Sequence, residues 1–130
     1  MMKKIVIVED DLAISQMYRM KFESDGFEVF LADNGKTGLE LIEQIYPDII
    51  LLDLIMPEMS GGEMLAILRT KEAFLKTPVV ILTNTESEKS EVEARMMGIS
   101  AYIVKANETP TQVVAKVRDI LNLAESNDKR

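Results

Sequence analysis

Short apolar runs alternate with longer amphipathic segments along the whole chain, and this alternation limits the possible folds more than any other feature. It is typical of a β-α repeat, in which the strands form a parallel sheet and the helices cover it. The first, third and fourth runs contain no polar residue, as expected of strands buried on both faces in the middle of the sheet. The five predicted strands are Ile5–Val8, Phe27–Ala32, Ile49–Leu52, Val79–Leu82 and Ala101–Val104.

The handedness of the crossovers limits how five parallel strands can be wound. We predict a doubly wound, flavodoxin-like α/β fold with five helices and the strand order 2-1-3-4-5. In that order the chain reverses its winding direction between strands 1 and 3, and ligands of open α/β sheets bind there, beyond the carboxyl ends of the strands. Glu9 and Asp10 directly follow the first strand and Asp53 follows the third, so three acids are predicted to converge at this point.

Three helix starts carry the pattern of a capping box, in which a hydroxyl and a carboxylate or amide three residues on satisfy free backbone N–H groups. These segments are Ser60–Glu63, Thr85–Glu88 and Thr109–Gln112. Asp11 is a candidate helix N-cap, and Pro110 suits the first position of the last helix. That helix carries an apolar stripe and closes the domain. We predict one domain over residues 1–125 and a polar tail over residues 126–130.

Composition excludes several classes of function. The chain has no cysteine and no histidine, which rules out disulfides, thiolate or imidazole metal ligands and a histidine-based catalytic triad. Its 15 basic and 22 acidic residues give a net charge of −7, the wrong sign for direct binding to nucleic acid. The apolar runs are far shorter than the roughly 18 residues that span a bilayer, and no signal-peptide pattern opens the chain. We expect a cytoplasmic domain without membrane contact.

The converging acids indicate a metal site. Three carboxylates within a few ångströms repel one another, and a hard divalent cation relieves that repulsion. Mg²⁺ prefers oxygen ligands and keeps several waters, whose places phosphoryl oxygens can take. Thr83 and Lys105 follow the fourth and fifth predicted strands, so they lie at the same edge of the sheet. This set suits phosphoryl transfer to Asp53, with Lys105 pairing with a phosphoryl oxygen and Thr83 donating a hydrogen bond.

Four motifs at these spacings resemble the receiver domains of two-component response regulators over residues 3 to about 122. They are VEDD after the first strand, LLDLIMPEMSGGE at the third, VVILTN at the fourth and AYIVK at the fifth. By position, Asp53 is similar to the phosphoacceptor of that family. The resemblance also implies that Mg²⁺ is bound by Asp10 and Asp53, by Glu9 through water, and by the carbonyl of Ile55.

The same resemblance implies a switch. A sensor histidine kinase or a histidine phosphotransfer protein supplies phosphate, and the chain catalyses its own phosphorylation and dephosphorylation without being a classical enzyme. Thr83 then swings toward the aspartyl phosphate and Tyr102 follows, while Lys105 is similar to the lysine of the family site. The face of the fourth helix, fifth strand and fifth helix changes its preference for a downstream target, in a monomer or a phosphorylation-linked dimer. Covering the sheet edge is the alternative role of Tyr102.

The chain departs from the family pattern at three positions. Ala106 stands where the family usually has a proline joined by a cis bond, and we expect the cis bond to be retained because a displaced Lys105 would leave the acids under-compensated. Asn84 is larger than the residue common after the threonine and is expected to narrow access to the phosphoryl group. Ile55 offers no hydrogen bond to an attacking water, so we predict slow dephosphorylation.

Other functions fit less well. Gly35-Lys36-Thr37 resembles the end of a phosphate-binding loop, but the first glycine of that motif would fall at Phe30. Phosphatases of the haloacid dehalogenase type need a second aspartate where this chain has Ile55. A degenerate receiver that only scaffolds protein contacts is the remaining alternative, kept open by Ala106. The pattern fits a stand-alone regulator, a phosphorelay intermediate or a part of a longer chain.

Overall fold

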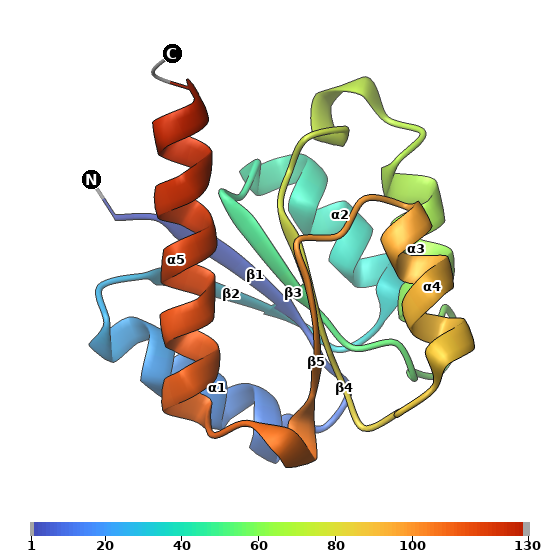
Figure 1. Cartoon of the computed structure of the whole chain (residues 1–130), viewed down its shortest axis with the longest axis horizontal. Coiled ribbons are helices and arrows are strands. Elements are labelled where there is room, and N and C mark those ends of the chain that lie inside the picture. The colour runs from blue at the N-terminus through green and yellow to red at the C-terminus, as the bar shows by residue number, and fades with distance from the viewer. Residues whose placement is uncertain (1, 129–130) are drawn as a thin grey trace.

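A computed structural model describes residues 2–128, and its centre is a parallel sheet of five strands in the order β2-β1-β3-β4-β5 (Figure 1). The strands are β1 (Lys4–Val8), β2 (Glu28–Ala32), β3 (Ile49–Leu52), β4 (Val79–Thr83) and β5 (Ala101–Val104). The predicted strand order and the flavodoxin-like fold are therefore confirmed, and each predicted strand agrees with the observed one to within one residue at either end.

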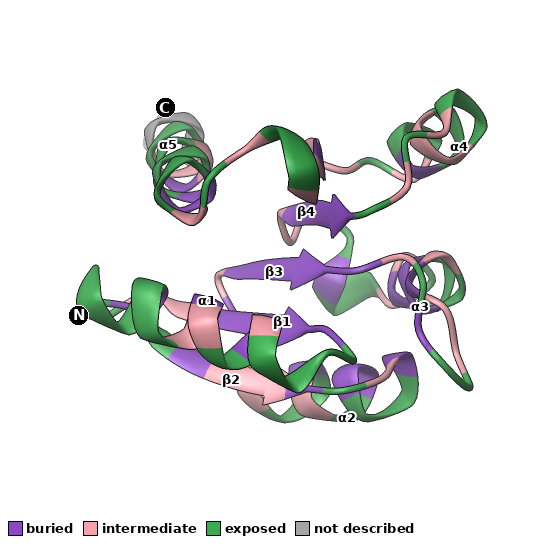
Figure 2. Ribbon diagram, turned by 90° about the horizontal axis from the view of Figure 1, so that it is seen from below, coloured by how far each residue is buried: buried purple, intermediate pink, exposed green. Residues whose placement is uncertain are grey.

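Helices cover both faces of the sheet. The helices are α1 (Leu12–Ser24), α2 (Gly35–Ile45), α3 (Gly61–Leu68), α4 (Glu88–Met96) and α5 (Pro110–Asp128), with short 3₁₀ helices η1 (Glu72–Phe74) and η2 (Lys105–Asn107). Figure 2 shows α1 and α5 on one side of the strands and α2, α3 and α4 on the other. β1, β3 and β4 lie in the middle and are buried along almost their whole length, as their apolar sequences predict.

Two hydrophobic clusters, one on each face, hold the layers together. Successive side chains of a strand point to opposite faces, so Ile5 and Ile7 pack with α1 and α5 whereas Val6 and Val8 pack with α2 and α3. Large aromatic residues fill the first cluster; the rings of Phe22 and Phe27, for example, meet edge to face at 5.2 Å. Burial on both faces positions the carboxyl ends of the central strands, and with them the acids that follow.

Two of the three predicted capping boxes are present. Ser60 and Glu63 exchange side-chain and backbone hydrogen bonds at the start of α3, and Thr109 and Gln112 do the same before α5. Asp11 caps α1 by accepting from the backbone N–H of Ile14, as predicted.

The predicted capping box at Thr85 is wrong. The side chain of Ser87 accepts from the N–H of Ser90, and α4 begins only after Ser87. The Thr85 N–H already donates to the hydroxyl of Thr83 at 3.3 Å, so residue 85 belongs to the loop that leaves β4.

The last helix extends further than the predicted domain end. α5 runs to Asp128 and so includes the first residues assigned to the polar tail, whereas residues 129 and 130 of that tail lie outside the described residues. None of the helices in the described part of the chain combines the length and apolar character needed to cross a membrane.

Candidate functional site

The register of the central strands brings the predicted acids together. β1 and β3 pair with Val8 opposite Leu52, and the backbone N–H of Asp53 donates to the carbonyl of Val8 at 3.0 Å. Glu9 and Asp53 therefore leave neighbouring strands side by side. A pocket of about 270 Å³ opens at this point, and its lining includes Glu9, Asp10, Asp53, Ile55, Thr83 and Lys105. Every predicted site residue except Tyr102 lines this pocket.

Glu9, Asp10 and Asp53 form a cluster suited to a hard cation. One carboxylate oxygen from each lies within 4.8 Å of the others. Glu9 and Asp53 are buried, with 5% and 7% of their surfaces exposed, whereas Asp10 is exposed. Three carboxylates beside a single ammonium leave an excess of two negative charges, which one divalent cation would neutralise. The donor set, all oxygen and partly open to solvent, fits Mg²⁺.

Lys105 is the cation that the chain itself supplies. It begins η2 directly after β5, and its Nζ donates to a carboxylate oxygen of Glu9 and, at 3.3 Å, to Oδ2 of Asp53. The expectation of a cis bond before Ala106 is wrong, because no peptide bond within residues 2–128 is cis. The 3₁₀ helix η2 places Lys105 next to the acids without a cis peptide bond.

Burial changes the titration of the paired groups. It raises the pKa of Glu9 to about 7, an effect that the hydrogen bond from Lys105 opposes and the neighbouring Asp53 reinforces. Burial alone would lower the pKa of Lys105, but the hydrogen bond to Glu9 and the charge of Asp53 raise it overall. The lysine therefore stays charged at neutral pH. In the absence of a cation Glu9 is partly protonated, which is how the cluster reduces its own repulsion.

The two predicted switch residues meet at Thr85. The hydroxyl of Thr83, which is fully buried, accepts from the Thr85 N–H at 3.3 Å. The Tyr102 hydroxyl donates to the Thr85 carbonyl at 3.0 Å, while its ring packs against the cluster beneath α4. The backbone of Thr85 thus links Thr83, which lines the pocket, to Tyr102 on β5. This link could not be predicted from the sequence, because Thr85 was assigned to the start of a helix.

Gly61 is a site residue that sequence reasoning missed. A Cβ atom at this position would lie 2.0 Å from the backbone carbonyl oxygen of Asp53, far inside any tolerated contact. The Gly61 N–H also donates to the Leu54 carbonyl at 2.9 Å. The start of α3 therefore packs directly on the backbone of the acid, and only glycine fits there. The Ser60-Gly61-Gly62 run was the available signal.

Ile55 lies at the mouth of the pocket. Its side chain is 65% exposed, and its backbone N–H donates to Oδ1 of Asp53 at 3.4 Å. The two carboxylate oxygens of Asp53 thus have different partners, since Oδ2 faces Lys105. No acidic group stands at residue 55 to serve as a second proton donor, as a haloacid dehalogenase phosphatase would need.

With this geometry established, comparison with known proteins identifies the family. The model of the response regulator receiver domain matches residues 5–118. The chain is a response regulator receiver domain. Such domains act in two-component systems, so the predicted family and its signalling role are confirmed.

Relatives of this receiver domain include longer regulators. The chain is 37% identical to the regulatory protein AtoC of Escherichia coli over 102 residues, which make up 78% of this chain and 22% of AtoC. It is 32% identical over 124 residues to the phosphate regulon transcriptional regulatory protein PhoB of Rhizobium meliloti, covering 95% of this chain and 54% of PhoB. The receiver domain thus spans about half the length of these relatives or less.

Solved structures share the receiver fold closely. A CheY-like receiver domain protein of Methanospirillum hungatei superposes with a TM-score of 0.89 at 29% identity, covering 98% of this chain and 99% of that one. The BeF3-activated receiver domain of Klebsiella pneumoniae RstA gives a TM-score of 0.82 at 30% identity, with 91% and 97% covered.

Proposed function

We propose that this receiver domain accepts a phosphoryl group on Asp53 in an Mg²⁺-dependent reaction. The observation that carries the proposal is the close approach of three carboxylates and one lysine around a single small pocket. Glu9, Asp10 and Asp53, with the carbonyl of Ile55, would hold the cation. When bound, Mg²⁺ supplies the positive charge that offsets the equatorial phosphoryl oxygens.

The residues of the chain would act on the phosphoryl group from several sides. A carboxylate oxygen of Asp53 attacks the phosphorus of a phosphohistidine on the donor; the new O–P bond forms as the P–N bond breaks, and the electron pair stays on the imidazole nitrogen. Lys105, already 3.3 Å from Oδ2 of Asp53, pairs with a phosphoryl oxygen. The Thr83 hydroxyl turns away from the Thr85 N–H, from which it accepts in the unphosphorylated domain, and donates to another phosphoryl oxygen.

Phosphorylation would then change the surface of the domain through a movement of Thr85. When the Thr83 hydroxyl turns toward the phosphoryl group, its hydrogen bond to the Thr85 N–H is lost, and the Thr85 carbonyl that holds Tyr102 shifts with it. The face of α4, β5 and α5 would change its preference for a downstream target. The phosphoryl donor would be a sensor histidine kinase or a histidine phosphotransfer protein in the cytoplasm, and the domain a monomer or a phosphorylation-linked dimer.

Acetyl phosphate tests the acceptor directly. We expect one added phosphoryl group by intact mass when the protein is incubated with Mg²⁺ and acetyl phosphate, and none for Asp53→Asn or in the presence of EDTA. Beryllofluoride with Mg²⁺ should change the environment of Tyr102, read by NMR. A protein that stays unmodified, and whose spectra stay unchanged, would support the scaffold alternative instead.

A further inference from the structure

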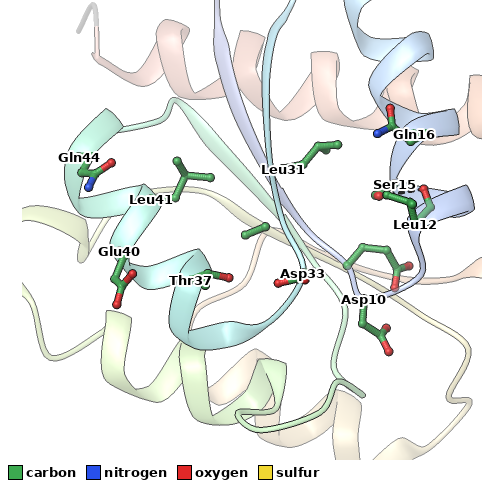
Figure 3. Close-up of a pocket in the computed structure, with 12 residues that line it drawn as sticks. Asp10, Leu12, Ser15, Gln16, Leu31, Asp33, Thr37, Glu40, Leu41 and Gln44 are labelled. Atoms are coloured by element: carbon green, nitrogen blue, oxygen red, sulfur yellow. Dashed lines mark hydrogen bonds between the residues drawn. The ribbon is translucent and has the colours of Figure 1, made fainter.

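A larger pocket, of about 640 Å³, wraps around the outer edge of β2 (Figure 3). One wall comes from α1, with Gln16, and the other from α2, with Thr37 and Leu41; Leu31 and Asp33 lie between them on β2 and the residues after it. Because α1 and α2 cover opposite faces of the sheet, the floor of this groove is the edge of the sheet itself. We call it the β2 groove.

The floor of the β2 groove carries backbone groups that no strand uses. The carbonyl of Ala32 accepts from the N–H of Glu9 on the β1 side at 3.0 Å. Backbone groups of successive residues in a strand face opposite edges, so Leu31, inside β2, directs its N–H and carbonyl away from β1. Within the described residues β2 pairs with β1 alone. The groove therefore presents an open strand edge at its centre, flanked by two helices.

The side chains around this edge have a definite chemistry. Asp10, Asp33 and Glu40 are exposed carboxylates, and Leu31 and Leu41 add apolar surface between them. Among the described residues that line the groove, none is basic. A ligand that offers backbone hydrogen bonds, cationic side chains and aliphatic groups would match all three features.

We propose that the β2 groove binds an extended, cationic segment of a partner protein, which adds to the sheet as a sixth strand on β2. The chain itself carries a net charge of −7 and the groove is acidic, so pairing between two copies would bring like charges together. Charge likewise excludes nucleic acid. Since the groove reaches Glu9 and Asp10, the added strand would end beside the pocket of Asp53. Binding does not require phosphorylation.

Hydrogen exchange read by NMR distinguishes strand addition from loose contact. The probe is an acetylated and amidated peptide of alternating arginine and valine. At a peptide concentration ten times Kd, exchange of the Leu31 amide should slow about tenfold, because a carbonyl of the peptide then accepts from it. The Phe30 amide faces β1 and is the internal reference, with no change expected. The same peptide with N-methylated backbone amides should not bind.

Matched variants test whether the negative charge of the β2 groove is needed for peptide binding. Asp33→Lys combined with Glu40→Lys should abolish peptide binding, whereas Glu72→Lys, an exposed acid on η1, should leave it intact. A peptide with glutamate in place of arginine should not bind. Equal binding by the N-methylated peptide, or protection of Leu31 that grows with protein concentration in the absence of peptide, would overturn the proposal. Asp53→Asn should bind the peptide normally, so failure of the β2 groove and failure of phosphorylation give separate results.

Discussion

Glu9 should make the stability of the metal-free receiver domain fall as the pH rises. Burial first, and the neighbouring Asp53 next, raise its pKa to about 7 against the opposing effect of Lys105, whereas its ordinary value is 4.5. A carboxyl group with a higher pKa in the folded state binds its proton more tightly there. Its stabilising contribution is therefore complete below pH 4.5 and is lost as the pH rises through 7.

The two pKa values set the size of the effect. The difference between them corresponds to about 3 kcal/mol of unfolding free energy. Because other carboxyl groups also titrate, the useful quantity is the difference between the wild type and Glu9→Gln, whose amide keeps the shape and the acceptor oxygen but does not titrate. Urea unfolding in EDTA, from about pH 4 to about pH 8.5, should show the wild type losing about 3 kcal/mol relative to Glu9→Gln.

Mg²⁺ and an exposed control complete this test. The cation binds carboxylates and not carboxylic acids, so it should stabilise the wild type more at pH 8 than at pH 5. Glu72→Gln, on the exposed start of η1, should run parallel to the wild type at every pH. If the difference between the wild type and Glu9→Gln stays constant from pH 4 to 8.5, Glu9 does not titrate as a buried carboxyl and the reasoning is refuted.

Three further outcomes follow from other contacts. The guanidinium of Arg69 donates to four backbone carbonyls, which lie in η1 and in the segments that follow η1 and α4. Arg69→Met should therefore lower the free energy of unfolding by about 2–4 kcal/mol, measured in urea. Arg95→Met removes only an exposed i,i+4 ion pair and should lower it by less than about 1 kcal/mol. Gly61→Ala should abolish beryllofluoride binding or unfold the domain, whereas Gly62→Ala, whose nearest contact would be at 3.9 Å, should be tolerated. Ile55→Asn should shorten the half-life of the phosphoprotein, measured by intact mass; an unchanged half-life would count against a role for this side chain.

Much of the fold could be predicted because a strand that is buried on both faces is a continuous run of apolar residues, which is easily recognised in the sequence. Ile49–Leu52 has no polar residue and was placed correctly to the residue. The edge strand was also found, although Phe27 lies just before it and instead packs on Phe22. Helix starts were less predictable. Ser60 and Thr85 both begin a segment with the capping-box pattern. Only the hydrogen bond from the Thr85 N–H to the Thr83 hydroxyl, seen in the structure, shows that Thr85 lies in a loop.

The site was predictable to the extent that it depends on strand ends. Glu9, Asp53 and Lys105 each follow a strand, and parallel strands end at one edge, so their convergence needed no further information. The glycine pair at residues 61 and 62 was a signal, but which of the two is needed depends on how closely the start of α3 approaches a backbone carbonyl, and only the structure shows that it is Gly61. The path of the chain after Lys105 was predicted wrongly for a similar reason: a 3₁₀ turn replaced the expected cis bond.

Charge explains why this edge of the sheet is suited to a reversible modification. Three carboxylates and Lys105 carry an excess of two negative charges in a partly buried pocket, where burial first and the neighbouring Asp53 next raise the pKa of Glu9. A divalent cation removes that excess and can leave again, whereas a second lysine in the chain would neutralise only one of the two charges and would do so permanently. Phosphorylation of Asp53 adds negative charge again, and the buried hydroxyl of Thr83 is a group of the pocket that can donate its proton to a phosphoryl oxygen. In the proposed switch, a response of this hydroxyl to the phosphoryl group would act on Thr85, which it already contacts, and through Thr85 on Tyr102.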